Sequence, residues 1–222
     1  MKSLRLDTSE DKGLSHWVTV SLQEAILNGQ FEPGEKLDQD LIAAQLQVSR
    51  TPVREALKVL ASEGYVEILP YRGAFIPRVS QRDIYDVYEI RWLIEPEVVR
   101  QATPLIPDAL ILQFEETFEQ QTAASGKWSE RQVLDTDQSF HALFTRHCQN
   151  QLIHEFLNKL NHRIFRVRNF AFRQPGTHLE VSLHEHCAIL EAVRQRDPDR
   201  AAELMQTHLK NSAYRICQYL NE

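Results

Sequence analysis

The sequence predicts a mostly α-helical protein, with an N-terminal winged helix-turn-helix followed by an all-α bundle of about six helices. Apolar residues recur at helical spacing through most of the 222 residues. Strand-like runs occur at 65-YVEIL-69 and 74-AFIPRV-79, and helical patterns alone follow Val79. We therefore expect a flexible tail over residues 1–12, the winged helix-turn-helix over 13–79 and the helical domain over 80–222.

Three helices are expected before residue 65. Residues 16–28 form an amphipathic pattern that Gly29 ends. Asp38 is a good N-cap for a short second helix, and Ser49 is a good N-cap for a third. Pro52 falls in the first turn of the third helix, where its missing N–H breaks no intrahelical bond. Two short helices joined by about three residues are typical of a helix-turn-helix.

The stretch 49-SRTPVREAL-57 begins the third helix with hydrogen-bond donors. Apolar residues between 53 and 60 form one stripe, while Thr51, Arg54 and Lys58 project from the other side and Arg50 lies on the flank. Hydroxyl and guanidinium groups beside free backbone N–H groups suit phosphate oxygens and guanine edges. Three basic residues alone would be more typical of a solvated charged face, but the helix-turn-helix around them favours DNA.

A β-hairpin is expected after the third helix. Gly64 ends that helix, and the two strand-like runs flank Pro70-Tyr71-Arg72-Gly73, a turn signal with a basic residue at its tip. Three helices followed by a hairpin make a winged helix-turn-helix.

These motifs resemble the DNA-binding domain of the GntR family of bacterial transcription regulators. The matching strings are 25-AILNGQFEPGEKL-37, 41-LIAAQLQVSRTPVREALKVLASEGYVE-67 and Gly73. In that family the recognition helix and the tip of the wing contact DNA. The resemblance therefore implies DNA contacts by Ser49, Arg50, Thr51, Arg54, Arg72 and Gly73.

Composition is that of an ordinary soluble globular protein, with 42% hydrophobic and 25% charged residues. The net charge is −6, and residues 1–79 hold nine Lys and Arg against eleven Asp and Glu. An acidic body with a local basic cluster favours selective, dimer-dependent DNA binding over indiscriminate coating. The sequence carries no signal-peptide pattern and no run long enough to span a membrane, and its three cysteines read as reduced core thiols of a cytoplasmic protein.

Polar residues fall on the apolar faces of three bundle helices. Asp137 and His141 share a face with Phe144, while His186 and His208 lie among aliphatic residues of two later helices. Burying all four without partners would cost several kcal/mol. A divalent metal would satisfy them together, as would an internal hydrogen-bond network, and the spacing alone leaves both alternatives open.

The helical segment resembles the FCD ligand-binding domain of the FadR-type subfamily. The matching strings are 137-DQSFH-141, 185-EHCAILEAV-193 and 201-AAELMQTHL-209. The resemblance implies one divalent metal ion per chain, Zn, Ni or Mn, held by Asp137, His141, His186 and His208. It also implies a small carboxylate effector, and the domain is expected to join two chains into a homodimer on palindromic operator DNA.

Arg91 is the candidate effector-binding residue. It lies on the apolar face of the first bundle helix, with Glu95 one turn further on. One interpretation is an intrahelical ion pair between the two, and the other is a guanidinium that grips the effector carboxylate. Both remain open.

The leading hypothesis is a DNA-binding transcription repressor without enzymatic activity or membrane attachment. One alternative is a metal-dependent hydrolase that uses the Asp/His3 site with Glu185 as base, and another is a winged helix used for protein contacts. Against an enzyme, the chain lacks a His-Asp dipeptide, a Gly-rich phosphate loop, a G-x-S-x-G elbow and an H-E-x-x-H helix. Glu185 also lies about 100° around its helix from His186.

Overall fold

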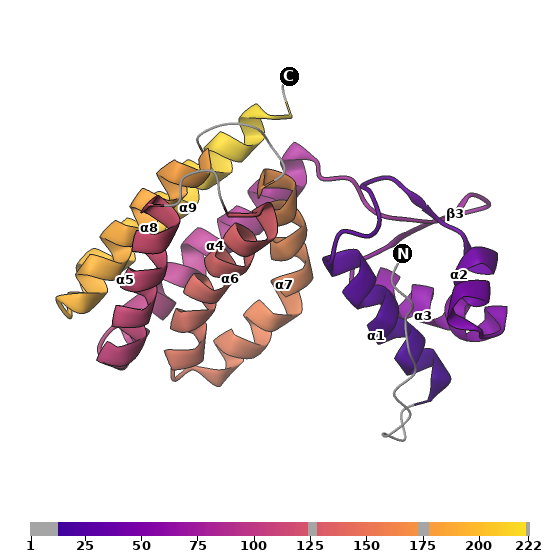
Figure 1. Ribbon diagram of the computed structural model, residues 1–222, viewed down its shortest axis with the longest axis horizontal. Helices are drawn as coiled ribbons and strands as arrows, with labels where there is room; N and C mark the ends of the chain where they lie inside the picture. Colours follow the sequence, from indigo (N-terminus) through magenta and orange to yellow (C-terminus); the bar gives the residue numbers. More distant parts are fainter. Residues whose placement is uncertain (1–12, 124–127, 173–177, 221–222) are drawn as a thin grey trace. The chain divides into compact units, whose positions relative to one another are not determined.

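The structure, a computed structural model, describes residues 13–123, 128–172 and 178–220, and the chain divides into two compact units (Figure 1). The first unit ends at Val79 and the second begins at Ser80. The mostly helical fold class is confirmed, with a small sheet confined to the first unit. The tail expected over residues 1–12 lies outside the described residues.

The first unit is a winged helix-turn-helix. Its elements in chain order are α1 (Leu14–Leu27), β1 (Lys36–Leu37), α2 (Gln39–Leu46), α3 (Arg50–Ser62), β2 (Glu67–Leu69) and β3 (Gly73–Phe75). The antiparallel sheet has the order β1-β3-β2, with Ala74 opposite both Leu37 and Ile68. The sequence predicted the β2–β3 hairpin but not β1, because two residues are too few to show strand alternation.

Helix caps and apolar burial position α3. Asp38 caps α2, because its carboxylate accepts from two backbone N–H groups at 2.9 and 3.2 Å. Ser49 is the N-cap residue of α3 by backbone conformation, but its side chain makes no capping hydrogen bond. Val53 and Leu60 are completely buried against the remaining core of the unit, while Arg54 is exposed. The stripe predicted from the sequence therefore holds α3 by one face and leaves the opposite face open.

The second unit is an all-α bundle. Its helices among the described residues are α4 (Gln81–Ala102), α5 (Asp108–Ala123), α6 (Glu130–His147), α7 (Gln151–Phe172), α8 (His178–Arg194) and α9 (Pro198–Gln218). Helix α4 packs along α9, and α8 packs against α9 and α5 (Figure 1). A capping box between Ser80 and Asp83 begins α4. Phe140 of α6 lies in the core and meets three other phenylalanines of α5 and α6 edge to face: Phe114, Phe118 and Phe144.

The prediction of three core thiols was wrong in part. Cys217 is buried, Cys148 is half-buried and Cys187 is exposed. The apolar face of α8 is narrower than the sequence pattern indicated, so Cys187 lies outside it. No helix in the described ranges is both long and apolar enough to cross a membrane.

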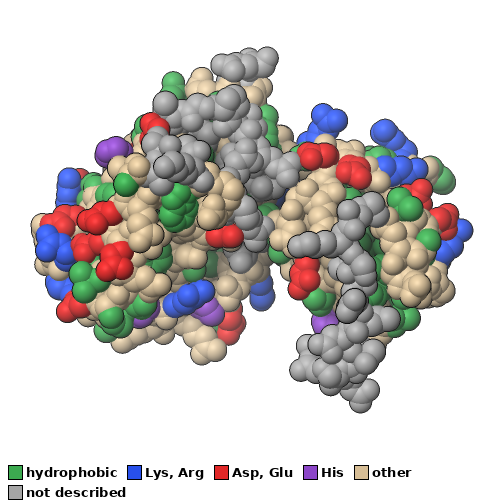
Figure 2. Space-filling model, viewed as in Figure 1, with side chains coloured by type: hydrophobic (Ala, Val, Ile, Leu, Met, Phe, Trp, Pro, Cys, Tyr) green, Lys and Arg blue, Asp and Glu red, His purple; other side chains and the backbone are tan. Residues whose placement is uncertain are grey.

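Acidic and basic side chains are interspersed on the surface of the second unit in view in Figure 2. Many of them pair within one helix, as Arg194 does with Glu191 and Arg200 with Glu203. Such exposed pairs contribute little to stability, because water screens the charges. These pairs keep the surface hydrophilic but do not determine the fold.

Arg196 makes a different kind of contact. It lies in the turn between α8 and α9 with a left-handed φ of 56°. Its guanidinium donates to the carbonyl oxygens of Thr103 at 2.9 Å and Ile106 at 2.7 Å, and to the Asp108 carboxylate. Thr103 and Ile106 are at most 1% exposed. Arg196 therefore joins the α8–α9 turn to the α4–α5 connection by hydrogen bonds.

We expect Arg196→Ala to lower the free energy of unfolding by about 1–3 kcal/mol, because two carbonyl groups lose a charged donor. Urea denaturation followed by circular dichroism measures the change. The matched control is Arg200→Ala, which loses one exposed in-helix pair and should change stability by about 0.5 kcal/mol or less. Equal unfolding midpoints for the two variants would show that the Arg196 hydrogen bonds do not stabilise the fold.

Candidate functional site

The exposed end of α3 carries the residues predicted to contact DNA. Ser49, Arg50, Thr51 and Arg54 are all exposed in the structure. The Ser49 hydroxyl is not used as a cap, so it remains available to an acceptor outside the helix. Hydroxyl and guanidinium donors are thus grouped on one surface of α3, as the sequence predicted.

Carboxylates partner both arginines of this surface. Arg50 Nε lies 2.7 Å from Asp40 Oδ1, and Arg54 Nε lies 3.6 Å from Glu55 Oε1. The Arg50 and Asp40 side chains are 71% and 66% exposed. Because such exposed pairs are weak, a phosphate or base edge can replace the carboxylate at little cost.

The tip of the hairpin presents an aromatic ring beside a basic residue. Tyr71 is fully exposed with a left-handed φ of 62°, and Arg72 stacks its guanidinium 5.8 Å from the ring of Phe75. Gly73 has a φ of 108°, a backbone conformation that residues with a side chain rarely adopt. A Cβ atom at this position would also lie 3.2 Å from the Lys36 side chain. Gly73 therefore forms the turn, while Tyr71, which sequence reasoning did not single out, joins Arg72 at its tip.

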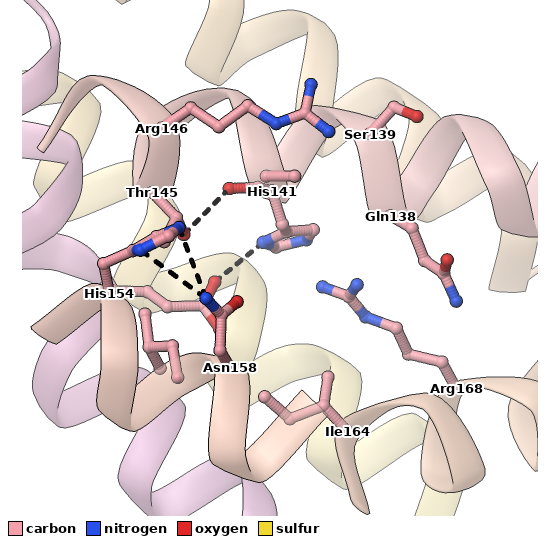
Figure 3. Close-up of a pocket in the computed structure, with 12 residues that line it drawn as sticks. Gln138, Ser139, His141, Thr145, Arg146, His154, Asn158, Ile164 and Arg168 are labelled. Atoms are coloured by element: carbon pink, nitrogen blue, oxygen red, sulfur yellow. Dashed lines mark hydrogen bonds and ion pairs between the residues drawn. The ribbon is translucent and has the colours of Figure 1, made fainter. Parts of the chain in front are cut away.

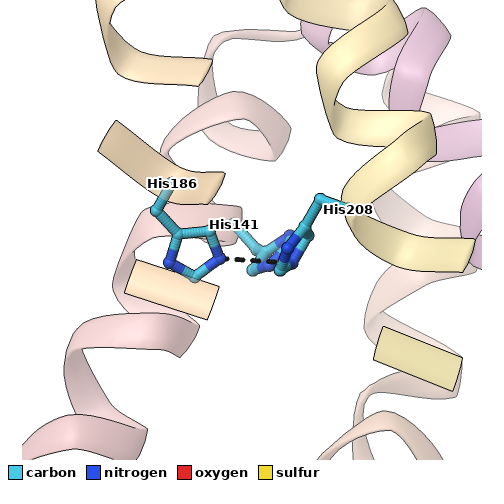
Figure 4. A group of neighbouring side chains, drawn as sticks. All are labelled: His141, His186 and His208. Carbon is cyan, nitrogen blue, oxygen red and sulfur yellow. Dashed lines mark hydrogen bonds between the residues drawn. The ribbon is translucent and has the colours of Figure 1, made fainter. Parts of the chain in front are cut away.

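Three buried histidines meet in the second unit. His141 comes from α6, His186 from α8 and His208 from α9, and one nitrogen from each lies within 4.8 Å of the others (Figure 4). The Nε2 atoms of His186 and His208 are 3.2 Å apart. The side chains are 3 to 7% exposed. The sequence predicted these histidines on apolar helix faces, and the bundle brings them together.

Asp137 borders the triad from one turn earlier on α6. Its Oδ1 lies 4.0 Å from His141 Nε2 and 3.7 Å from His186 Nε2. Its Oδ2 lies 3.1 Å from Arg168 Nε, which is within ion-pair distance, but it is fully buried and its geometry makes no hydrogen bond. A buried carboxylate oxygen without a hydrogen bond is costly unless another positive group satisfies it.

Arg91 and Glu95 form a buried pair beside His141. Arg91 Nε donates to Glu95 Oε1 at 2.5 Å, and His141 Nδ1 lies 2.7 Å from Glu95 Oε2. Arg91 Nη2 also lies 3.3 Å from His141 Nδ1. An ionised carboxylate can only accept, so the Nδ1 of His141 carries its proton and its Nε2 is an acceptor, with Arg91 Nη2 at 3.4 Å. Arg91 is 1% exposed, so this is no surface pair.

The same arrangement recurs at His208. Its Nδ1 lies 2.7 Å from Glu185 Oε2, and Arg215 donates to both Glu185 oxygens at 2.9 and 2.7 Å. Glu185 therefore orients His208 and does not point into the triad. Sequence reasoning placed Glu185 away from the metal side but missed this role, because a contact between α8 and α9 has no signal within either helix.

Burial and charge keep two of the three imidazoles, those of His141 and His186, neutral. Burial lowers the pKa of His141 and of His186 well below the ordinary histidine value, and nearby positive groups lower it further. Metal binding needs neutral imidazole, so these two residues are already in the binding form at pH 7.

The carboxylates stay ionised in spite of burial. Burial alone would raise the pKa of Glu95, but Arg91 and His141 outweigh it and hold that pKa well below its ordinary value. Likewise, hydrogen bonds from His208 and Arg215 overcome burial and lower the pKa of Glu185 to about 2.

This donor set fits a divalent metal ion. Two nitrogens each about 2.1 Å from one ion lie roughly 3.0–3.4 Å apart, which matches the His186–His208 separation of 3.2 Å. Glutamates hold His141 and His208 in the tautomer that frees Nε2, as the outer partners of metal-bound histidines do. Asp137 adds a carboxylate oxygen, Oδ1, at 4.0 Å from His141 Nε2 and 3.7 Å from His186 Nε2. The buried triad could therefore bind a metal.

A cavity of about 20 Å³ adjoins this centre. Its wall includes Arg91, Asp137, His141, Arg168 and His208. A second, open cavity of about 300 Å³ lies on the other side of His141 and Arg168. The site thus combines an ion-sized space with room for a small molecule.

A winged helix-turn-helix joined to a C-terminal helical domain defines a class of protein, the two-domain DNA-binding regulator. Residues 14–76 match the bacterial regulatory proteins of the gntR family, and residues 86–211 match the FCD domain. The chain belongs to the GntR family of DNA-binding transcription regulators, in the branch with a C-terminal FCD domain, and this is a family of regulators, not of enzymes.

Individual relatives cover most of the chain. The HTH-type transcriptional repressor RspR of Escherichia coli K12 is 29% identical over 90% of this chain and 88% of its own length. The Nta operon transcriptional regulator of Aminobacter aminovorans is 28% identical over 86% of this chain and 88% of its own. A GntR regulator from Rhodococcus sp. RHA1 shares the fold, with a TM-score of 0.75 at 24% identity over 92% of this chain and 97% of its own.

We expect the purified protein to hold about one divalent ion per chain, and His186→Ala to lose it, because removing one nitrogen breaks the triad. Elemental analysis after purification without chelator measures the content. His184→Ala is the matched control, since it changes an exposed histidine two residues away on the same helix and should leave the ion bound. Equal metal content in the two variants, or none in the unmodified protein, would support the hydrogen-bond network instead.

Metal affinity should fall at a lower pH than it would in a site of exposed histidines. Protons compete for histidine nitrogens at about pH 6.5 in an exposed site. Because burial lowers the pKa of His141 and His186, we expect affinity to stay level through that pH and to fall only under more acidic conditions. Competition with a fluorescent zinc chelator from pH 7.5 to 5 measures this. A loss centred at pH 6.5 would contradict control of the metal affinity by these two buried imidazoles.

Proposed function

We propose that the protein is a cytoplasmic repressor that binds palindromic operator DNA as a homodimer and loses affinity for it when a small carboxylate binds beside a divalent metal ion. The observation that carries this proposal is the buried histidine triad in contact with ionised carboxylates and arginines, next to a cavity. The relative RspR is named a repressor, which supports the sign of regulation.

DNA recognition would use two exposed parts of the first unit, the N-terminal part of α3 and the tip of the wing. Arg54 would read a base edge from α3, while Ser49, Arg50 and Thr51 would meet phosphates at the N-terminus of the same helix. Arg72, with Gly73 shaping the turn, would contact the backbone from the wing. One recognition helix reads only a few base pairs, and the acidic chain gains little from phosphate attraction, so a two-fold dimer on a palindrome is expected.

The metal would be held by His141, His186, His208 and Asp137. When bound, an ion of this kind offers coordination positions to a carboxylate oxygen. Zn, Ni and Mn all accept such nitrogen and oxygen donors. The neutral imidazoles of His141 and His186 and the ionised Asp137 supply such donors without any change of protonation at neutral pH.

Arg91 is proposed as the effector-binding residue. Its guanidinium lines the cavity at the triad but is paired with Glu95. A carboxylate effector would have to compete with Glu95 for it, which would move α4. Helix α4 begins immediately after the last residue of the first unit, so its movement can be transmitted to the DNA-binding residues along the chain. An effector shifts operator affinity only by its differential affinity for the two arrangements, typically about 1–3 kcal/mol.

The first test concerns base readout. Arg54→Ala should weaken operator binding by about 1–3 kcal/mol and relax base preference at one position of each half-site. Selection of bound DNA from a random pool, for the unmodified protein and the variant, measures both. Lys58→Ala is the control on the same helix face, since a phosphate contact would weaken all sequences alike. An unchanged consensus for Arg54→Ala would exclude Arg54 from direct readout.

The second test concerns the effector. Arg91→Lys keeps a positive charge next to Glu95 but cannot bind a carboxylate through two parallel hydrogen bonds. We expect it to bind operator DNA normally and to lose the response to organic acids. Fluorescence anisotropy of labelled operator, titrated with acids in the presence of metal, measures the response. A response equal to that of the unmodified protein would leave Arg91 only as the partner of Glu95.

A further inference from the structure

The charged groups around the histidine triad cancel one another. Three arginines each face one carboxylate: Arg91 with Glu95 at 2.5 Å, Arg168 with Asp137 at 3.1 Å, and Arg215 with Glu185 at 2.7 Å. With neutral imidazoles, this set has a net charge of zero. A divalent ion held by the triad would therefore add two positive charges that none of these partners balances.

Uncompensated charge in this site would be expensive. The side chains of Arg91, Glu95, Asp137 and Arg168 are at most 11% exposed, so water screens them poorly. Removing charge from water costs several kcal/mol per ion unless an opposite charge accompanies it. The bound ligand is the remaining source of negative charge at the ion.

The 300 Å³ cavity beside the triad adds a further positive group. Figure 3 draws its lining, in which Arg168 and His141 belong to the wall shared with the metal centre. Arg146, at the end of α6, is exposed and forms no ion pair within the described residues. Among the described residues of this lining, Glu95 is the one carboxylate, and Arg91 already neutralises it. His154 and Asn158 hydrogen-bond each other on the α7 side (Figure 3).

We infer that the effector carries two separate anionic groups, as a short-chain dicarboxylate does, with one carboxylate at the metal and Arg168 and the other at Arg146. This inference rests on the proposed function and narrows its ligand class. Two separate groups are favoured over one doubly charged phosphate because the cavity has positive groups at two places, in its inner wall and at Arg146. Its volume of about 300 Å³ is at the small end for ligand sites, which suits an acid of a few carbons.

Matched acids test the inference. Succinate with butyrate, and glutarate with valerate, differ within each pair by one carboxylate at constant chain length. We expect calorimetric titration of the metal-loaded, full-length protein to give at least tenfold tighter binding for the dicarboxylate of each pair. Inorganic phosphate is the third probe and should bind more weakly than the dicarboxylates. Equal binding within both pairs, no binding by either dicarboxylate, or tighter binding of phosphate would overturn the inference.

Two variants locate the second anionic group. Arg146→Gln should reduce the preference for succinate over butyrate to below threefold by weakening succinate alone. Arg200→Gln, which removes an exposed arginine of α9, should keep the full preference. Removal of the metal with chelator should weaken both acids, because their shared carboxylate loses the ion. An Arg146→Gln protein with the unmodified preference would exclude Arg146 as the second subsite.

Operator binding separates this inference from the proposed function. If dicarboxylates and monocarboxylates bind equally and both change operator affinity, the dianion inference fails while the proposed regulation stands. If dicarboxylates bind preferentially but leave operator affinity unchanged, the ligand class stands and the proposed regulation fails.

Discussion

Burial of three imidazoles at one point is the constraint on which the second unit depends. His141, His186 and His208 come from three helices, so their meeting fixes the relative positions of α6, α8 and α9. Neutral histidines can be buried only if each polar nitrogen finds a partner. Glutamates satisfy the outer nitrogens of His141 and His208, and a metal would satisfy the inner ones. The polar residues here are thus arranged around a ligand, while the phenylalanine cluster beside them supplies the packing.

The arginines make this arrangement possible. A carboxylate buried next to a histidine would otherwise take up a proton, because burial raises its pKa. Arg91 and Arg215 prevent this at Glu95 and Glu185, so both glutamates stay acceptors and hold the imidazoles in one tautomer. In the site, an arginine thus contacts a glutamate, and that glutamate contacts a histidine.

The sequence predicted most of the fold and the histidines of the site. Helix boundaries followed from caps and from 3.6-residue periodicity, and His141, His186 and His208 stood out as polar residues on apolar faces. The contacts between elements were not predictable in the same way. Glu185 meets His208 across the α8–α9 packing, and Asp40 meets Arg50 across a turn, so neither contact has a periodic signal within one element. Strand β1 was missed because it exists only through pairing with β3. Exposure of Tyr71 and Cys187 likewise depends on tertiary packing.

Helix α4 connects the ligand site to the start of the second unit. Near its middle, Arg91 and Glu95 contact His141 of α6. At its N-terminus, Asp83 both closes the capping box and pairs with Arg166 of α7 at 2.6 Å. Helix α7 also carries Arg168, which faces Asp137 and lines both cavities. A ligand that displaced Arg168 or competed for Arg91 would thus act on α4 at two places, through its own side chains and through α7. Because the capping box at Ser80 directly follows Val79, the first residues that such a displacement reaches are those that join the helical domain to the wing.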